Sequence, residues 1–204
     1  MKTGKKALLL ALCAVLLVAA SVLGTMAYLT SSDSVKNTFT VGNVAITLDE
    51  AKVGTDGKAL SGDQAVRVDE NSYKLMPGHV YDKDPIIHVD NTSEDCYLFI
   101  KVEDGISEIE DAKTVATQLS ENGWVAVAGH AGVYVYGTEA TPTVVTKGTD
   151  VNTFKTITVK GDITNTQLAS YATKEIVVTA YAVQVDGFSG KTATQILTTA
   201  FPTL

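Results

Sequence analysis

The stretch KEIVVTAYAVQVDGF, residues 174–188, constrains the fold more strongly than any other part of the chain. Most of its residues are β-branched, aromatic or otherwise apolar, and polar side chains recur only at intervals. Residues of these kinds fit the extended, pleated backbone of a β-strand. The stretch therefore predicts the strongest strand of the chain, and weaker versions of the same pattern recur elsewhere.

Alternation with a period of two marks the other predicted strands. In residues 39–50, Val44, Ile46 and Leu48 share one face, which indicates a half-buried strand. Residues 85–104 read as two strands around a polar turn, and the second is apolar on both faces, as expected of a central strand. Further strands are predicted in the segments 123–129, 132–138 and 154–162.

Three segments change to a helical pattern. Residues 107–123 repeat apolar residues at three and four positions, which predicts an amphipathic helix followed by Gly123. Residues 164–171 predict a helical turn, and residues 189–201 a short closing helix. The remaining segments 53–63, 71–85 and 137–151 are interpreted as turns and loops.

Many short strands, few helices and Gly-rich turns predict a mainly β protein. We expect one antiparallel β-sandwich with short helical insertions, preceded by an N-terminal signal helix. Residues 28–204 are long enough for a single domain with a core, and no low-complexity linker divides them.

The N-terminus has the layout of a secretory signal. Lys2, Lys5 and Lys6 precede the uncharged apolar run Ala7–Leu23, and small residues follow it. Residues 1–27 are therefore interpreted as a signal peptide. An uncleaved membrane anchor is the alternative, because a spanning helix needs about 20 apolar residues and the uncharged run continues past Leu23.

The expected cut lies between Ala27 and Tyr28. Ala27 and Thr25 are small enough for a signal peptidase pocket. Removal of the signal takes away three lysines and no acidic residue, which leaves 13 basic and 23 acidic residues and a net charge of −10. Such a surface repels nucleic acid and anionic lipid, so we expect no nucleic-acid partner and membrane contact only through an uncleaved signal.

No sequence motif for catalysis or for metal binding stands out. His79, His88 and His130 are scattered, and Cys96, which the cut leaves as the single thiol, is interpreted as a small buried residue. We therefore expect no enzyme activity, no cofactor and no catalytic or metal-ligating residue. His88 alternates with apolar residues, which predicts a partly buried histidine with a hydrogen-bond partner.

Two clusters leave alternatives open. The carboxylates around residues 82–95 indicate a solvated acidic edge, with a calcium site as the alternative; they are Asp82, Asp84, Asp90, Glu94 and Asp95. The aromatic residues on strand positions indicate core and cross-strand packing, with an aromatic ligand patch as the alternative; they are Trp124, Tyr134, Tyr136 and Tyr181.

Three segments carry a family resemblance. The first, ASVLGTMAYLTSSDSVKNTFTVGNVAITL, combines an apolar run, Gly-Thr-x-Ala, an aromatic residue at the new N-terminus and Asn-x-Phe-x-x-Gly. The second, LMPGHVYDKDPIIHVDNTSEDCYLFIKVE, contains Pro-Gly, Lys-x-Pro and Asn-x-Ser-x-x-x-Tyr, and the third is VTAYAVQVDGF. Together they resemble the secreted TasA/camelysin family of Gram-positive bacteria, which is exported through a SipW-type signal peptidase.

The resemblance implies a jelly-roll-like sandwich at the cell surface or in the extracellular matrix, where such proteins form biofilm fibres. It also implies that the segment after the cut can leave its own domain and join a neighbour as a strand. Camelysin is described as a metallo-endopeptidase, which makes a secreted metalloprotease one alternative function, although no zinc motif is present.

The main hypothesis is therefore a secreted structural protein that self-associates, or joins related matrix subunits, by strand addition. Residues 28–40 are the candidate mobile donor, and the apolar residues of the candidate strand are Val35, Phe39 and Val41. The alternative for this segment is the first strand of its own sandwich. A second alternative function is a surface module that binds a glycan or a host protein through the loops 53–63 and 137–151.

Overall fold

The computed structural model describes residues 4, 6, 12–17 and 43–204. Residues 12–17 are helical and fall inside the expected signal helix. Within the described ranges, no helix combines the length and the apolar character that are needed to cross a membrane.

Several expectations fall outside these ranges. They are the cut between Ala27 and Tyr28 and the candidate donor residues Val35, Phe39 and Val41. Residues 43–204 belong to one compact unit, which is described below.

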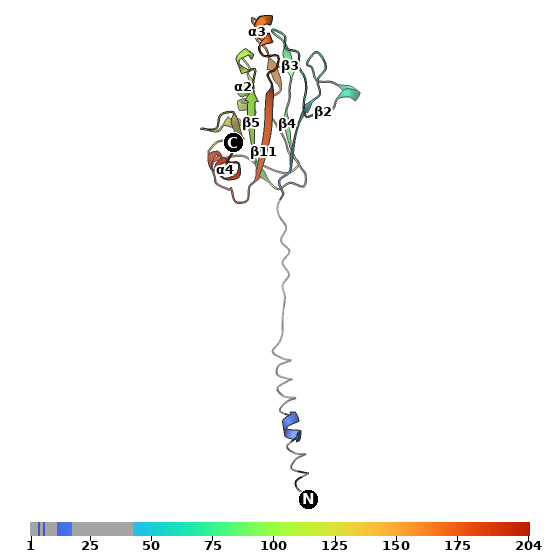
Figure 1. Ribbon diagram of the computed structural model, residues 1–204, viewed down its shortest axis with the longest axis vertical. Helices are drawn as coiled ribbons and strands as arrows, with labels where there is room; N and C mark the ends of the chain where they lie inside the picture. The colour runs from blue at the N-terminus through green and yellow to red at the C-terminus, as the bar shows by residue number, and fades with distance from the viewer. Residues whose placement is uncertain (1–3, 5, 7–11, 18–42) are drawn as a thin grey trace. The chain divides into compact units, whose positions relative to one another are not determined.

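Two antiparallel sheets pack face to face in residues 43–204, and the expected mainly-β sandwich is confirmed (Figure 1). One sheet has the order β2-β1-β4-β9, with β1 at Ile46–Ala51, β2 at Arg67–Val68, β4 at Ile86–Val89 and β9 at Asp150–Asn152. The other has the order β11-β5-β7-β6, with β5 at Cys96–Asp104, β6 at Trp124–Ala126, β7 at Val133–Tyr136 and β11 at Ile176–Gln184. Strand β8 (Val144–Val145) also pairs with β5.

Strands β3 (Val80–Asp82) and β10 (Thr156–Thr158) continue the pairing of β4 with β9 in the same register. Lys83 N donates to Lys155 O at 3.0 Å between the two pairs. Pro85 has no N–H to give, and it interrupts the ladder at this point. The interpretation of residues 71–85 as a connection without a strand was therefore wrong at β3.

β5 is the central strand that its two apolar faces predict, because it lies between β11 and β7. Leu98, Ile100 and Val102 point into the core between the sheets. Tyr97 and Phe99 point to the outer face, where they pack in a second apolar cluster. Both faces of this strand are therefore covered.

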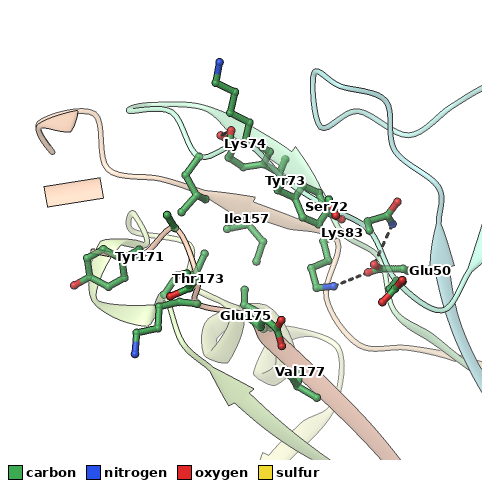
Figure 2. Close-up of a pocket in the computed structure, with 18 of the residues that line it drawn as sticks. Glu50, Ser72, Tyr73, Lys74, Lys83, Ile157, Tyr171, Thr173, Glu175 and Val177 are labelled. Carbon is green, nitrogen blue, oxygen red and sulfur yellow. Dashed lines mark hydrogen bonds and ion pairs between the residues drawn. The ribbon is translucent and has the colours of Figure 1, made fainter. Parts of the chain in front are cut away.

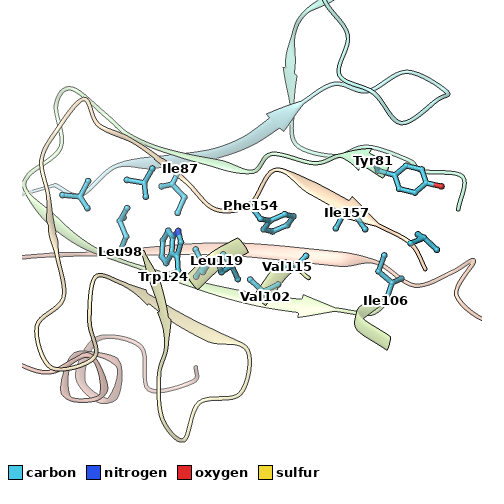
Figure 3. Packing of buried hydrophobic residues seen from close by; sticks show 14 of the residues in the cluster. Tyr81, Ile87, Leu98, Val102, Ile106, Val115, Leu119, Trp124, Phe154 and Ile157 are labelled. Carbon is cyan, nitrogen blue, oxygen red and sulfur yellow. The ribbon is translucent and has the colours of Figure 1, made fainter. Parts of the chain in front are cut away.

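The main core fills the space between the two sheets (Figure 3). One sheet and its connections contribute Tyr81, Ile87, Phe154 and Ile157, and the other contributes Leu98, Val102, Ile106 and Trp124. Alternation is the reason: the residues of β4 that are in phase with Ile87 are buried, and those in phase with His88 face outward.

Helix α2 (Val115–Glu121) is shorter than the helix expected at residues 107–123. Glu110 forms a β-bridge with Val159, and Asp111 N donates to Thr158 O at 2.8 Å, so this backbone stays extended against β10. Thr114 caps the helix by accepting from Thr117 N, as N-cap threonines do. Gly123 ends it at a φ of 84°, a conformation that favours glycine.

The last two helices lie where their patterns predict them, with α3 at Asn165–Ala169 and α4 at Ala193–Ala200. Ile196 and Leu197 of α4 are fully buried in the second cluster. α4 thus covers the outer face of the sheet at β5 and β11 (Figure 1).

Segment 137–151, expected as a loop, contains β8 and the start of β9. Val145 of β8 is buried and pairs with Cys96, and Val151 of β9 is buried and pairs with Ile87. Strands of two or three residues give too little alternation to be distinguished from loop in the sequence.

The two long sides of the sandwich differ. On one side α2 and the start of β6 close the gap. Gln118 of α2 donates to Thr156 O at 2.7 Å, and Asn122 Nδ2 and Trp124 Nε1 donate to the carbonyls of Thr153 and Asn152 at 2.7 and 2.9 Å. On the other side lie β1 and β11. Only a short contact joins these two strands, and this side holds the cavity described next.

Candidate functional site

A cavity of about 990 Å³ opens between the end of β1 and the start of β11 (Figure 2). Its walls come from Leu48–Glu50, the segment Asp69–Leu75, the turn after α3 and residues Ile176–Val178. Leu48, Ile106, Ile157 and Leu168 give it an apolar floor that continues the main core. The volume lies in the range of sites that bind small molecules or peptide side chains.

Glu50 is the buried acidic group of this cavity, with a residue exposure of 4%. It follows Ile46 and Leu48 at a period of two, so the strand points its carboxylate toward the core side. Lys83 Nζ donates to Oε2 at 2.7 Å, and Asn71 Nδ2 donates to Oε1 at 3.0 Å (Figure 2). We call Glu50, Asn71 and Lys83 the Glu50 cluster.

No motif in the sequence marks the Glu50 cluster. Its one signal was an acidic residue in phase with the apolar positions of a predicted strand, and such a residue needs a partner when it is buried. The two partners lie 21 and 33 residues along the chain from Glu50. Only the fold brings them together.

Two tyrosines form the wall next to the cluster. Tyr73 Oη donates to Asp82 O at 3.0 Å, and Tyr81 Oη donates to Lys74 O at 2.6 Å while it accepts from Met76 N. Burial, followed by the nearby Glu50 and Asp84 carboxylates, raises the pKa of Tyr73 well above its usual value. Its phenol is therefore a hydrogen-bond donor at neutral pH.

A charged network covers the outer face of β1, β4 and β9. His88 Nε2 lies 3.0 Å from Asp49 Oδ1, and its Nδ1 lies 2.7 Å from Asp150 Oδ1. Arg67 bonds to the carboxylates of Asp49 and Asp84 and to both of their carbonyls. The expectation that His88 is partly buried with a hydrogen-bond partner is confirmed.

The carboxylates around residues 82–95 bind different partners. Asp82 accepts from Lys58 Nζ and Ala59 N, and Asp90 accepts from Thr92 N in a local turn. Asp84 accepts from Ala51 N at 2.7 Å, whereas Glu94 and Asp95 are exposed. Across residues 43–204 and the short N-terminal ranges, no three His, Cys, Asp or Glu side chains are grouped to hold a metal ion.

The remaining single candidates have separate environments. His79 lies against the Tyr81 ring and bonds to Asp56 O, and His130 bonds to Leu204 O. Cys96 is fully buried, and burial raises the pKa of its thiol to about 11, so it stays protonated at neutral pH.

The aromatic candidates do not form one patch. Trp124 is buried and packs on Tyr136 with 5.3 Å between the ring centroids, and Tyr134 packs against the same core. Tyr181 lies in the second cluster, where its ring centroid is 5.4 Å from that of Phe201. The interpretation as core and cross-strand packing therefore matches their positions.

No protein-family model, curated protein or solved structure matches the chain.

Proposed function

We propose that this chain is a secreted structural protein of the bacterial cell surface, a subunit of extracellular matrix fibres that assembles by strand addition. Export through a SipW-type signal peptidase and kinship with the TasA/camelysin proteins belong to the same proposal. The observation that carries it is the edge of β11, which pairs only with β5 among the described strands.

An unpaired strand edge offers a row of backbone N–H and C=O groups to another strand. β11 runs for nine residues, and Val177 on it is 41% exposed. The cavity that holds the Glu50 cluster lies beside this edge and is apolar at its floor, so it offers space for side chains of an added strand. Backbone pairing gives affinity in such contacts, and pockets for alternate side chains give specificity.

The pattern of the candidate donor suits this acceptor. Val35, Phe39 and Val41 all occupy odd positions, so an extended segment would present them on one face. If each copy donates to the next, the contact is head-to-tail and does not close, which produces filaments.

The test uses the protein exported from a Gram-positive host and purified from the medium. N-terminal sequencing should give Tyr28, and negative-stain electron microscopy should show filaments. A chain that begins at Asn43 should stay monomeric, because it lacks the donor.

Val177→Lys should also prevent filaments, since a charge on an edge strand opposes pairing. The matched control is Val144→Lys, at a valine of similar exposure (44%) on β8. A monomeric exported protein at high concentration would contradict the proposal and favour the surface-binding alternative. Filaments that persist in the Val177 variant would exclude the β11 edge as the acceptor.

A further inference from the structure

We propose that the Glu50 cluster is a self-reacting cross-link site, at which Lys83 Nζ displaces the amide nitrogen of Asn71 and joins the two side chains through an isopeptide bond. The inference does not depend on the proposed function. It stands on three contacts that supply a nucleophile, an acid–base group and an activated carbonyl at one buried point.

The Asn71 carboxamide is held in one orientation. Its Oδ1 accepts from Val53 N at 2.9 Å, and its Nδ2 donates to Ala51 O at 2.8 Å and to Glu50 Oε1 at 3.0 Å. All three contacts agree in donor and acceptor, which fixes the amide against a flip. The oxygen of the Asn71 side-chain carbonyl is therefore bonded to the Val53 N–H, and the nitrogen that would leave is bonded to the Glu50 carboxylate.

Lys83 bonds to the other oxygen of the Glu50 carboxylate, since its Nζ donates to Oε2 at 2.7 Å. Both side chains are largely shielded, at 14% exposure for Lys83 and 5% for Glu50. Nζ also lies 5.8 Å from the centroid of the Tyr73 ring. This shielding from bulk water strengthens the electrostatic contact between Lys83 and Glu50.

The reaction balances without any co-reactant. Glu50 takes a proton from the Lys83 ammonium, and the freed lone pair of Nζ attacks Asn71 Cγ. The charge that develops on Oδ1 is stabilised by the Val53 N–H, as in an oxyanion hole. The Cγ–Nδ2 bond then breaks, Nδ2 receives protons through Glu50, and one ammonium ion leaves while Glu50 returns to its carboxylate form.

The attack requires Nζ to swing from Oε2 toward Cγ. Lysine has a flexible four-carbon stem, and the cavity that Lys83, Asn71 and Glu50 jointly line leaves room for this movement. The product would tie the segment after β2 to the segment after β3 across β1. Such a tie strengthens a fold in which Cys96, the one cysteine of residues 43–204, is a free thiol.

Mass spectrometry of the purified full chain tests the inference. The wild-type protein should weigh one ammonia less than its sequence, about 17 Da. Tryptic digestion should yield a branched peptide that joins residues 68–74 to residues 75–101, because an amidated Lys83 is not cleaved.

Glu50→Gln and Lys83→Arg should both give unlinked peptides, since the first removes the acid–base group and the second the amine nucleophile. Circular dichroism checks that the variants are folded. Lys58→Arg, at a half-exposed lysine paired with Asp82, is the matched control and should keep the branched peptide. Separate, unmodified peptides 68–74 and 75–83 from folded wild-type protein, after days at neutral pH, would overturn the inference.

Discussion

Gln118 of α2 pairs with Thr156 of β10 as a neighbouring strand would. Its Nε2 donates to Thr156 O at 2.7 Å, and its Oε1 accepts from Thr156 N at 3.2 Å and from Lys155 N at 3.1 Å. A side-chain amide thus satisfies the edge of β10 on the side that α2 closes. Gln118 itself is 3% exposed.

Replacement of Gln118 by leucine should destabilise the protein. The change leaves the backbone groups of residues 155 and 156 without partners, and each such buried group costs about 1–3 kcal/mol. Urea unfolding followed by circular dichroism should give a loss of at least about 2 kcal/mol in unfolding free energy. Ser120→Leu, an exposed change on the same helix, is the control; equal losses in the two variants would argue against the edge-capping contact.

His88 should make stability depend on pH. Burial disfavours its charged form, but the hydrogen bonds to Asp49 and Asp150 outweigh burial and raise the pKa of His88 above 6.5. The stabilisation is therefore complete below pH 6.5 and is lost as the pH rises through the folded-state pKa. His88→Gln should lower the melting temperature by about 2–4 °C at pH 5.5, the shift expected for about 1 kcal/mol, and by less at pH 8.5.

The control for this experiment is His79→Gln, at a histidine that bonds to the Asp56 carbonyl and lies against the Tyr81 ring. Differential scanning calorimetry at the two pH values measures both variants. A His88 variant whose melting temperature falls equally at pH 5.5 and 8.5 would show that packing, and not the paired charge, carries the effect.

Glu110 should also make the protein less stable as the pH rises, as His88 does, although Glu110 is an acid and His88 a base. Burial, and then the neighbouring Asp104, raise the pKa of Glu110 to about 7 although Val115 N donates to its Oε2. Its Oε1 lacks a hydrogen-bond partner, which protonation would supply by allowing a bond to Asp104. The folded state therefore holds a proton that the unfolded chain releases near pH 4.5, and stability falls as the pH rises from 4.5 through 7.

Glu110→Gln keeps the shape and removes this titration. The variant should be more stable than the wild type at pH 8 and should lose less stability between pH 5 and pH 8. Urea unfolding at pH 5 and pH 8 gives the change in unfolding free energy with pH for each protein. An equal loss of unfolding free energy in wild type and variant would mean that Glu110 is ionised throughout this range.

Gly57 allows the turn before Ala59 to lie on the Tyr81 ring. Its φ is 72°, and a Cβ at this position would overlap Tyr81 Cδ1. Gly57→Ala should cost about 2–4 kcal/mol from overpacking and backbone strain together. Gly62→Ala is the matched control, because its φ is 63° with no atom within 4 Å of the added carbon, so the difference in melting temperature isolates the clash.

The sequence predicted the elements whose pattern is long enough to be unambiguous. The nine residues of β11 and the two-faced run of β5 formed strands as expected, and Gly123 follows the end of α2 as predicted. Alternation also placed Val44, Ile46 and Leu48 on one face of a half-buried strand, and all three pack against the main core. These features depend on local backbone preference and on a period of two, both of which can be counted along the chain.

Short strands and one helix start escaped prediction, because distant partners decide them. β3 and β8 are strands only because β10 and β5 supply their hydrogen bonds, and the helix at residues 107–123 begins late because Glu110 pairs with Val159.

The sequence alone therefore determined a mainly β, acidic chain and the positions of its longer strands, since period and composition are local properties. Only the tertiary structure decided which long side of the sandwich α2 closes and which side leaves the β11 edge beside a cavity. It also decided that Glu50 meets Lys83 and Asn71, because a buried carboxylate takes whichever partners the packing of the two sheets brings within hydrogen-bond distance.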